Sequence, residues 1–228
     1  MPKPAIGSWI ESWLSAPRWN RYLAECANDP ERAFATYEWN LDLGQAILRD
    51  IACLEVAVRN AYDRVIDARW HGSSHWLLDP RSPALAPLWR SSHGRRVDIN
   101  TRNRETVSTA VARSGGTNTT SGQVIAELPL GFWRHLSDTG HEIELWRPYL
   151  CHAWPPRTTR TMVDTAMQRI NETRNRAAHG EPLFGGGATS TTLVVHYDVV
   201  NLSGMLTQSI GDYIAATSTV SDIWGRRP

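Results

Sequence analysis

The chain has 228 residues and a formal net charge of +1, with 41% hydrophobic and 21% charged residues. These values are typical of a globular protein, and they exclude a disordered chain and a polycation that binds nucleic acid through its overall charge. No apolar run approaches the length of a membrane span or of a signal peptide's apolar core. We therefore expect one cytoplasmic domain over residues 1–228, with no membrane partner.

The cysteines and histidines predict neither a metal site nor a cofactor. Cys26, Cys53 and Cys151 are odd in number and far apart in the chain, without the paired spacing of a zinc or disulfide motif. His71 and His75 are four residues apart, but the glycine and two serines between them disfavour the helix that would align both on one ion. We expect no metal.

The first 29 residues predict two short helices, the first from its apolar spacing and the second from a start near Pro17. Asp29 followed by Pro30 is a helix-start pattern, and no proline interrupts the chain from there to about Trp70. A long helical region is therefore expected, with Gly44 as its candidate break.

An apolar stripe with three- and four-residue spacing runs through this long region. Its members are Ile47, Ile51, Leu54, Val58, Ala61 and Val65. Glu55 and Arg59 lie beside the stripe and are four residues apart, so their charges can pair across one turn. Considered alone, such a pair is a surface ion pair worth about 0.3–0.5 kcal/mol.

Residues 71–92 contain three prolines and predict an irregular connection. The following segment, 90–113, is the one local basic cluster, with six arginines against two acidic residues. Two interpretations are open, a solvated helix face and a surface that follows RNA phosphates. The second would use Arg95, Arg96, Arg102 and Arg104, together with Arg176 further along the chain.

Four further elements are expected. After a Gly/Ser/Thr loop at 114–121, Ser121 is the expected cap of a helix that Pro129 and Gly131 kink. Later helices are expected at 141–151, from Thr158, and near 193–217. The chain is thus predicted to be all-α, a single-domain bundle of about seven helices around a Trp-rich core, with the helices of residues 1–29 and 193–217 packing on it.

The helix that opens near Thr158 has an arginine on its inward face. That face is defined by Val163, Met167, Ile170, Ala177 and Ala178. Arg174 falls on the same stripe, where a guanidinium must either extend to solvent or find hydrogen-bonding partners. Asn175 and His179 are four apart on the helix, and Gly180 with Pro182 predicts its end. A histidine at that end is also favoured by the helix dipole alone.

Three stretches of the chain carry recognisable motifs: "LEVAVRN" at 54–60, "VIAELPLGFWRHL" at 124–136 and "RNRAAHGEPLF" at 174–184. They resemble the Abi-like (abortive-infection) branch of the HEPN (higher eukaryotes and prokaryotes nucleotide-binding) superfamily. The first resembles the family's L-E-x-x-x-R-N core and the second its Gly-Phe-Trp turn. The third begins with "RNRAAH", residues 174–179, which resembles the R-x4-6-H motif, and the likeness continues to Phe184. The order matches over residues 30–185. Gly185–Gly187 and the 114–121 loop depart from the family pattern.

The resemblance implies an all-α endoribonuclease of the abortive-infection or toxin type that cleaves RNA without metal or cofactor. His179 would transfer protons during attack by the 2′-hydroxyl, Arg174 would hold the phosphate, and Asn175 would orient one of them. Glu55, Arg59 and Asn60 would support this site. The family's active cleft commonly lies between two protomers, so the resemblance implies a homodimer. It also implies tRNA or mRNA as the substrate and a role in phage defence.

The alternative is a non-catalytic HEPN-like module that binds RNA or nucleotide, or assembles with other proteins, and in which Arg174 is structural. An antitoxin or a phage-derived trigger as partner is compatible with both interpretations.

Overall fold

The computed structural model describes residues 5–92, 94–184 and 188–228. In this part of the chain 67% of residues are helical, in ten α-helices, and a small two-stranded sheet is added. The mostly helical expectation is confirmed, but about seven helices was too few. The predicted departure at Gly185–Gly187 lies outside the described residues. In the described segments, no helix is both long and apolar enough to cross a membrane.

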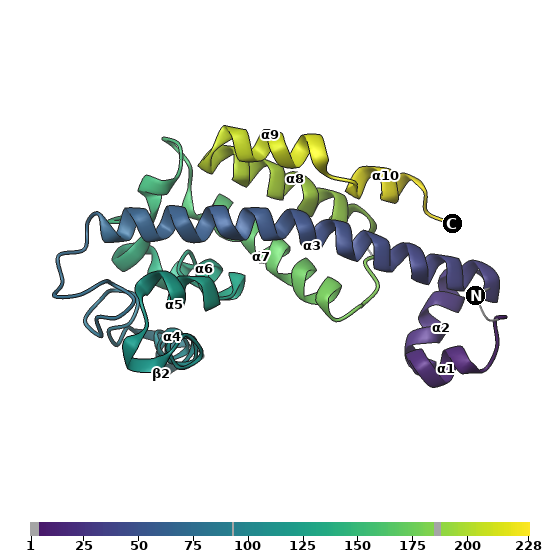
Figure 1. Cartoon of the computed structure of the whole chain (residues 1–228), viewed down its shortest axis with the longest axis horizontal. Helices are drawn as coiled ribbons and strands as arrows, with labels where there is room; N and C mark the ends of the chain where they lie inside the picture. Colours follow the sequence, from purple (N-terminus) through teal and green to yellow (C-terminus); the bar gives the residue numbers. More distant parts are fainter. Residues whose placement is uncertain (1–4, 93, 185–187) are drawn as a thin grey trace.

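The other helices and the two strands are shorter and are arranged around one long helix, α3. The N-terminal half contains α1 (Trp9–Leu14), α2 (Ala16–Glu25), α3 (Pro30–Asp67), β1 (Trp89–Ser92), β2 (Arg95–Asp98) and α4 (Thr101–Arg113). The C-terminal half contains α5 (Ser121–Glu127), α6 (Leu130–His135), α7 (Arg160–Ala178), α8 (Ala188–Leu206), α9 (Gln208–Thr217) and α10 (Val220–Gly225). In Figure 1, α3 runs the length of the molecule, with α1 and α2 at one end and α4 to α6 at the other.

The long helix α3 forms without a break over 38 residues. Asp29 caps it, since its side chain accepts hydrogen bonds from the N–H groups of Glu31 (3.0 Å) and Arg32 (3.2 Å). The predicted break at Gly44 is absent. Gly44 is buried instead, and a Cβ added there would lie 3.8 Å from the Ala177 Cβ of α7. The glycine therefore marks where α7 crosses α3.

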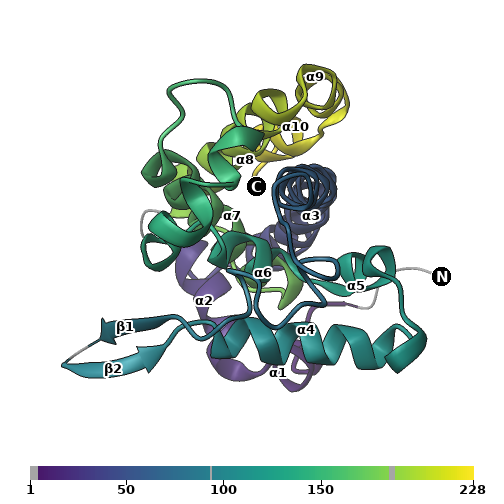
Figure 2. The same cartoon turned by 90° about the vertical axis from the view of Figure 1, so that its left-hand side faces the viewer.

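The hairpin of β1 and β2 was not predicted. Its antiparallel register pairs Trp89 with Asp98 and Ser92 with Arg95. Gly94 has a φ of +74°, a conformation that glycine adopts at little cost, at the turn between the strands. The hairpin projects from the helical body (Figure 2). Because it buries little, its residues lack the alternation of apolar and polar side chains by which strands are recognised.

The predicted kinked helix after the 114–121 loop is two helices. The cap of α5 is Thr120 and not Ser121, with the reciprocal hydrogen bonds of a capping box between Thr120 and Gln123. The chain is extended at Leu128 and Pro129 before α6 begins. The helix expected at 141–151 is also absent as such. Thr139–His141 and Leu150–Ala153 are short 3₁₀ turns, and Glu142–Trp146 is a π-helical turn.

The single C-terminal helix predicted near 193–217 is instead the pair α8 and α9, which reverse at Thr207. Gly204 and Gly211 allow this reversal. A Cβ on Gly211 would lie 2.7 Å from the Gly204 Cα, so any larger residue would force the two helices apart. Apolar periodicity continues across the turn, which is why the sequence reads as one helix.

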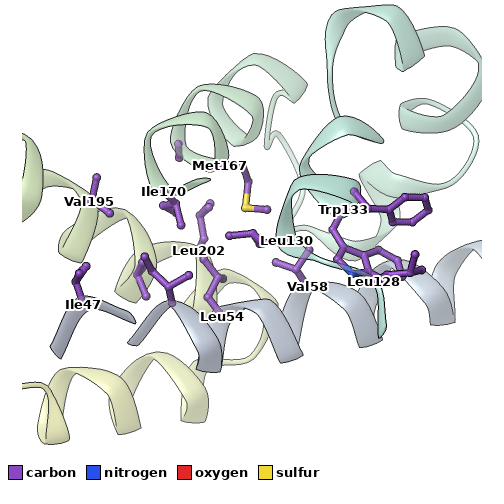
Figure 3. Close-up of a cluster of buried hydrophobic side chains, with 14 of the residues drawn as sticks. Ile47, Leu54, Val58, Leu128, Leu130, Trp133, Met167, Ile170, Val195 and Leu202 are labelled. Carbon is purple, nitrogen blue, oxygen red and sulfur yellow. The ribbon is translucent and has the colours of Figure 1, made fainter. Parts of the chain in front are cut away.

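A connected set of buried side chains joins α3 to the later helices. All six members of the predicted α3 stripe are buried. Figure 3 shows Leu54 and Val58 of α3 facing Leu130 of α6, Met167 of α7 and Leu202 of α8. The three cysteines are free thiols. This packing holds α3, α6 and α7 in the relative positions on which the candidate site depends.

Candidate active site

The motif lies on the last two turns of α7. Thr159 caps this helix, where Thr158 had been expected, by accepting a hydrogen bond from the Met162 N–H at 3.2 Å. The helix ends at His179, and Gly180 follows with a φ of +62°. The predicted glycine-terminated end is therefore confirmed.

Glu55 of α3 and Arg174 of α7 lie within electrostatic reach of each other. Both side chains are half-buried. Burial raises the pKa of the Glu55 carboxyl, while the Arg174 guanidinium, a hydrogen bond from the Leu130 N–H and the Arg59 guanidinium each lower it. Residues 55, 59, 130 and 174, which come from all three family-like stretches, are thus brought together by α3, α6 and α7.

The two arginines of this group keep unused hydrogen-bond donors. The Nε of Arg59 is buried and has no hydrogen-bond partner among the described residues. Arg174 makes a contact at the limit of hydrogen bonding, 3.5 Å from its Nη1 to Oδ1 of Asn175. Two guanidinium groups beside one carboxylate leave a local positive charge, and their free N–H groups match the oxygens of a phosphate.

Two residues outside the predicted catalytic set complete the surroundings. A Cβ built on Gly131 would lie 3.4 Å from Oδ1 of Asn171 and 3.9 Å from Nη2 of Arg102. Arg102 of α4 therefore reaches the first turn of α6, next to the Leu130 N–H that holds Glu55. Arg102 was predicted to bind RNA only, and Asn171 was not predicted at all. The position of Asn171, three residues before Arg174 on the same helix, was the available signal.

His179 is not joined to this group by any described contact within one chain. It is exposed, and its backbone carbonyl accepts a hydrogen bond from Arg18 at 3.2 Å. Five helical residues correspond to about 140° around the axis and about 7.5 Å along it, so His179 and Arg174 leave α7 in different directions. Asn175 and Asn60 are exposed as well.

The predicted RNA-binding arginines differ in how free they are. Arg95 and Arg96 are exposed on the hairpin, where Arg96 stacks over Trp89 at 5.1 Å. Arg104 donates to Asp98 at 2.5 Å and to the Leu85 carbonyl at 2.8 Å, and Arg176 donates to the Pro182 carbonyl. Arg104 and Arg176 therefore have structural partners already, whereas Arg95, Arg96 and Arg102 are available to a ligand.

A second polar cluster has the residue types of a serine hydrolase but not its geometry. Ser218 Oγ donates to Oδ2 of the fully buried Asp50 at 2.5 Å, and Nδ1 of His196 lies 3.3 Å from the same oxygen. In a catalytic triad the histidine stands between serine and acid and uses a different nitrogen for each. Here Ser218 and Asp50 both face Nδ1, so the cluster serves to tie α8 and the end of α9 to α3.

A pocket of about 600 Å³ lies between α7, α8 and α9, lined in part by Arg169, Asp198 and Gln208. It contains none of the predicted site residues. A smaller cavity of about 90 Å³ lies between α3 and the end of α7, next to Ala177 and Gly180. It is too small for a nucleotide, and Arg174 does not line it.

The chain was compared with protein families, with curated proteins and with solved structures. None of the three comparisons finds a match.

Proposed function

We propose that this protein is a metal-independent endoribonuclease of the abortive-infection type. The observation that carries the proposal is the grouping of Glu55, Arg59 and Arg174, each of which belongs to a stretch that resembles the Abi-like HEPN pattern. Arg174 and Glu55 are both half-buried and come from different helices. Two guanidinium groups beside one carboxylate suit a site in which a second anion, the scissile phosphate, binds next to that carboxylate.

In this mechanism the 2′-hydroxyl oxygen attacks the neighbouring phosphorus, and the bond from phosphorus to the 5′-oxygen breaks. The products are a 2′,3′-cyclic phosphate and a 5′-hydroxyl end. Arg174, with Arg59, stabilises the charge that builds on the phosphoryl oxygens. His179 transfers the protons, a role that imidazole performs well near neutral pH and that typically contributes about 10²–10⁴ in rate. Asn175 orients the phosphate or the imidazole by a hydrogen bond.

The proposal includes a homodimer with the C-terminal ends of two α7 helices close together. Within one chain His179 points away from Arg174, so a complete site needs RNA that spans both residues or a second copy of the motif. The exposure of Asn175 and His179 supports this arrangement, because both side chains are free to face a partner or a substrate. A monomeric mass in sedimentation analysis at assay concentrations would contradict the dimer.

The test is cleavage of purified tRNA and total RNA in excess EDTA, with end-group analysis of the products. Wild-type protein should leave cyclic-phosphate ends. Arg174→Ala and His179→Ala should lose at least about 10² in rate. His152→Ala removes another exposed histidine and Arg64→Ala another arginine of α3, and both should cleave as wild type does. Circular dichroism in the same buffer verifies that each protein is folded.

The main alternative is a non-catalytic module that binds RNA or nucleotide or assembles with a partner. The separation of His179 from the Glu55, Arg59 and Arg174 group within one chain favours it. In that case folded wild-type protein would retain RNA in a binding assay without cutting it, and Arg174→Ala would weaken binding while His179→Ala would not. An antitoxin or a phage-derived trigger remains a proposed partner under either function.

A further inference from the structure

Two histidines and an aspartate converge at the end of α6. His135 is its last residue, and Asp138 and His141 follow at intervals of three. One ligand atom from each lies within 4.8 Å of the other two. The His141 side chain is fully buried, and those of His135 and Asp138 are 15% and 23% exposed.

The hydrogen bonds of Asn100 determine which nitrogen of His141 carries a proton. The Asn100 amide nitrogen donates to the carbonyls of Pro83 (3.0 Å) and Ala86 (2.7 Å), so its Oδ1 is an acceptor. His141 Nε2 lies 2.8 Å from that Oδ1 and must therefore donate to it. A neutral His141 consequently has its lone pair on Nδ1.

His135 is arranged in the same way. Its Nε2 lies 3.3 Å from the backbone carbonyl oxygen of Ile99, which can only accept. The Nδ1 atoms of His135 and His141 then face the two oxygens of Asp138, each at 2.7 Å. In two neutral rings, both lone pairs would point at a carboxylate, which is repulsive. Each contact becomes favourable only when a proton or another cation lies between the nitrogen and the oxygen.

The two imidazole rings lie close together, with centroids 4.8 Å apart, and both Nδ1 atoms face the same carboxylate. The His141 ring is fully buried. One divalent cation bound by both Nδ1 atoms and the carboxylate would satisfy all three groups at once.

We propose that His135, Asp138 and His141 bind a divalent transition-metal ion of the zinc class. Two imidazole nitrogens and a carboxylate oxygen suit zinc and its neighbours better than magnesium or calcium. Both Nε2–H groups already donate to carbonyl oxygens, the outer contacts that metal-bound histidines almost always have. In a tetrahedral zinc site the ligand atoms are roughly 3.3 Å apart. The ligand atoms now lie within 4.8 Å of one another, with each Nδ1 2.7 Å from an Asp138 oxygen, so binding requires side-chain shifts that bring all three to that separation, with solvent as the fourth ligand.

The ion would be structural. It fastens the end of α6 to residues 99 and 100, which connect the hairpin to α4, through the histidines that contact them. It lies at the opposite end of α6 from Leu130, and no step of RNA cleavage passes through it. No metal was expected from the cysteines or from His71 with His75. The spacing His135-x2-Asp138-x2-His141 is the signal in the sequence that indicates this site.

The test is direct titration of chelator-treated full-length protein with Co²⁺ and with Zn²⁺ at pH 7.5. We expect one equivalent of Co²⁺ to give the visible absorption of a tetrahedral nitrogen and oxygen site, and one equivalent of Zn²⁺ to displace it. Zn²⁺ should also raise the unfolding temperature by mass action. His135→Gln and Asp138→Asn should weaken binding by more than the roughly 10- to 100-fold that loss of an outer partner costs.

His75 provides the matched control. It too contacts a carboxylate, since its Nε2 lies 3.0 Å from Asp63, but its Nδ1 accepts the Leu77 N–H, so one proton satisfies the ring. His75→Gln should leave the Co²⁺ spectrum unchanged. Absence of stoichiometric binding by folded wild-type protein would overturn the proposal, as would binding that survives both His135→Gln and Asp138→Asn. Neither result involves RNA, so this proposal and the ribonuclease fail separately.

Discussion

The Asn40 side chain of α3 makes two hydrogen bonds to the backbone that follows the motif, one to Leu183 and one to Glu181. Its Oδ1 accepts from the Leu183 N–H at 2.7 Å, and its Nδ2 donates to the Glu181 carbonyl at 3.2 Å. The side chain is 2% exposed, so these backbone groups have little access to water. The segment that leaves α7 after His179 is therefore fixed by the N-terminal third of the long helix.

Asn40→Ala should lower the free energy of unfolding by about 1–3 kcal/mol, because the Leu183 N–H is left buried without an acceptor. Chemical denaturation measures this change. Asn60→Ala, at an exposed position of the same helix, should change stability by less than about 0.5 kcal/mol. Equal effects of the two substitutions would show that the buried hydrogen bonds are unimportant.

The same substitution at two glycines should have opposite effects. At Gly44 the added Cβ meets its nearest neighbour at 3.8 Å, which is ordinary contact, so Gly44→Ala should stabilise the protein by about 0.5–1 kcal/mol through helix propensity. At Gly211 the Cβ would be 2.7 Å from the Gly204 Cα, so Gly211→Ala should destabilise by about 1–3 kcal/mol. Thermal unfolding of both variants would contradict this packing if the two shifts had the same sign.

Glu55 predicts a pH-dependent contribution to stability. Its pKa is raised in the folded protein from an ordinary value of 4.5, with burial as the largest cause. A raised carboxyl pKa means that the folded state binds the proton more tightly, so stability falls as the pH rises from near 4 through the folded pKa. Glu55→Gln lacks this titration.

Unfolding of wild type and Glu55→Gln should therefore be compared by urea titration at several pH values from 4 to 7. The wild type should lose stability relative to the variant as the pH rises across this range. A difference that stays constant with pH would contradict the raised pKa. A difference that grows in favour of wild type would show that Arg174 and Arg59 outweigh the burial of the carboxylate.

Arg102 and Arg104 should separate RNA binding from stability. Arg102 is exposed and reaches the first turn of α6, so Arg102→Ala should weaken RNA binding and reduce the salt slope by about 0.7–0.9, the loss of one phosphate contact. Arg104→Ala removes the contacts to Asp98 and the Leu85 carbonyl and should cost about 1–2 kcal/mol of stability. RNA affinity at several salt concentrations, measured beside denaturation, checks both. A fully retained salt slope in Arg102→Ala would remove Arg102 from the RNA surface.

The long elements could be predicted from the sequence because their information is local. The α3 stripe has helical spacing, Asp29 and Pro30 give its start, and Gly180 with Pro182 gives the end of α7. The rest depends on contacts distant in the chain. Gly44 reads as a helix breaker until α7 is placed against it, and Gly204 and Gly211 show their purpose only when α8 and α9 pack together.

The candidate site was likewise predictable from the sequence only in part. Helical spacing put Arg174 on the inward face of α7, and motif resemblance selected Glu55 and Arg59. Their approach to each other follows from the crossing of α3 and α7, which no local pattern encodes. Three further features likewise arise from tertiary packing. Arg102 approaches Gly131, His179 is exposed, and His135 and His141 both contact Asp138.

The central position of α3 has a consequence for synthesis of the protein on the ribosome. The helix contacts α2, α6, α7, α8, α9 and α10, and all of these except α2 follow it in the chain. Its apolar stripe is thus translated well before most of the surfaces that cover it. At about 5–20 residues per second, roughly 7–30 seconds separate the end of α3 from the end of α8. During this interval the nascent chain exposes an uncovered apolar helix, and we expect chaperones to bind it there.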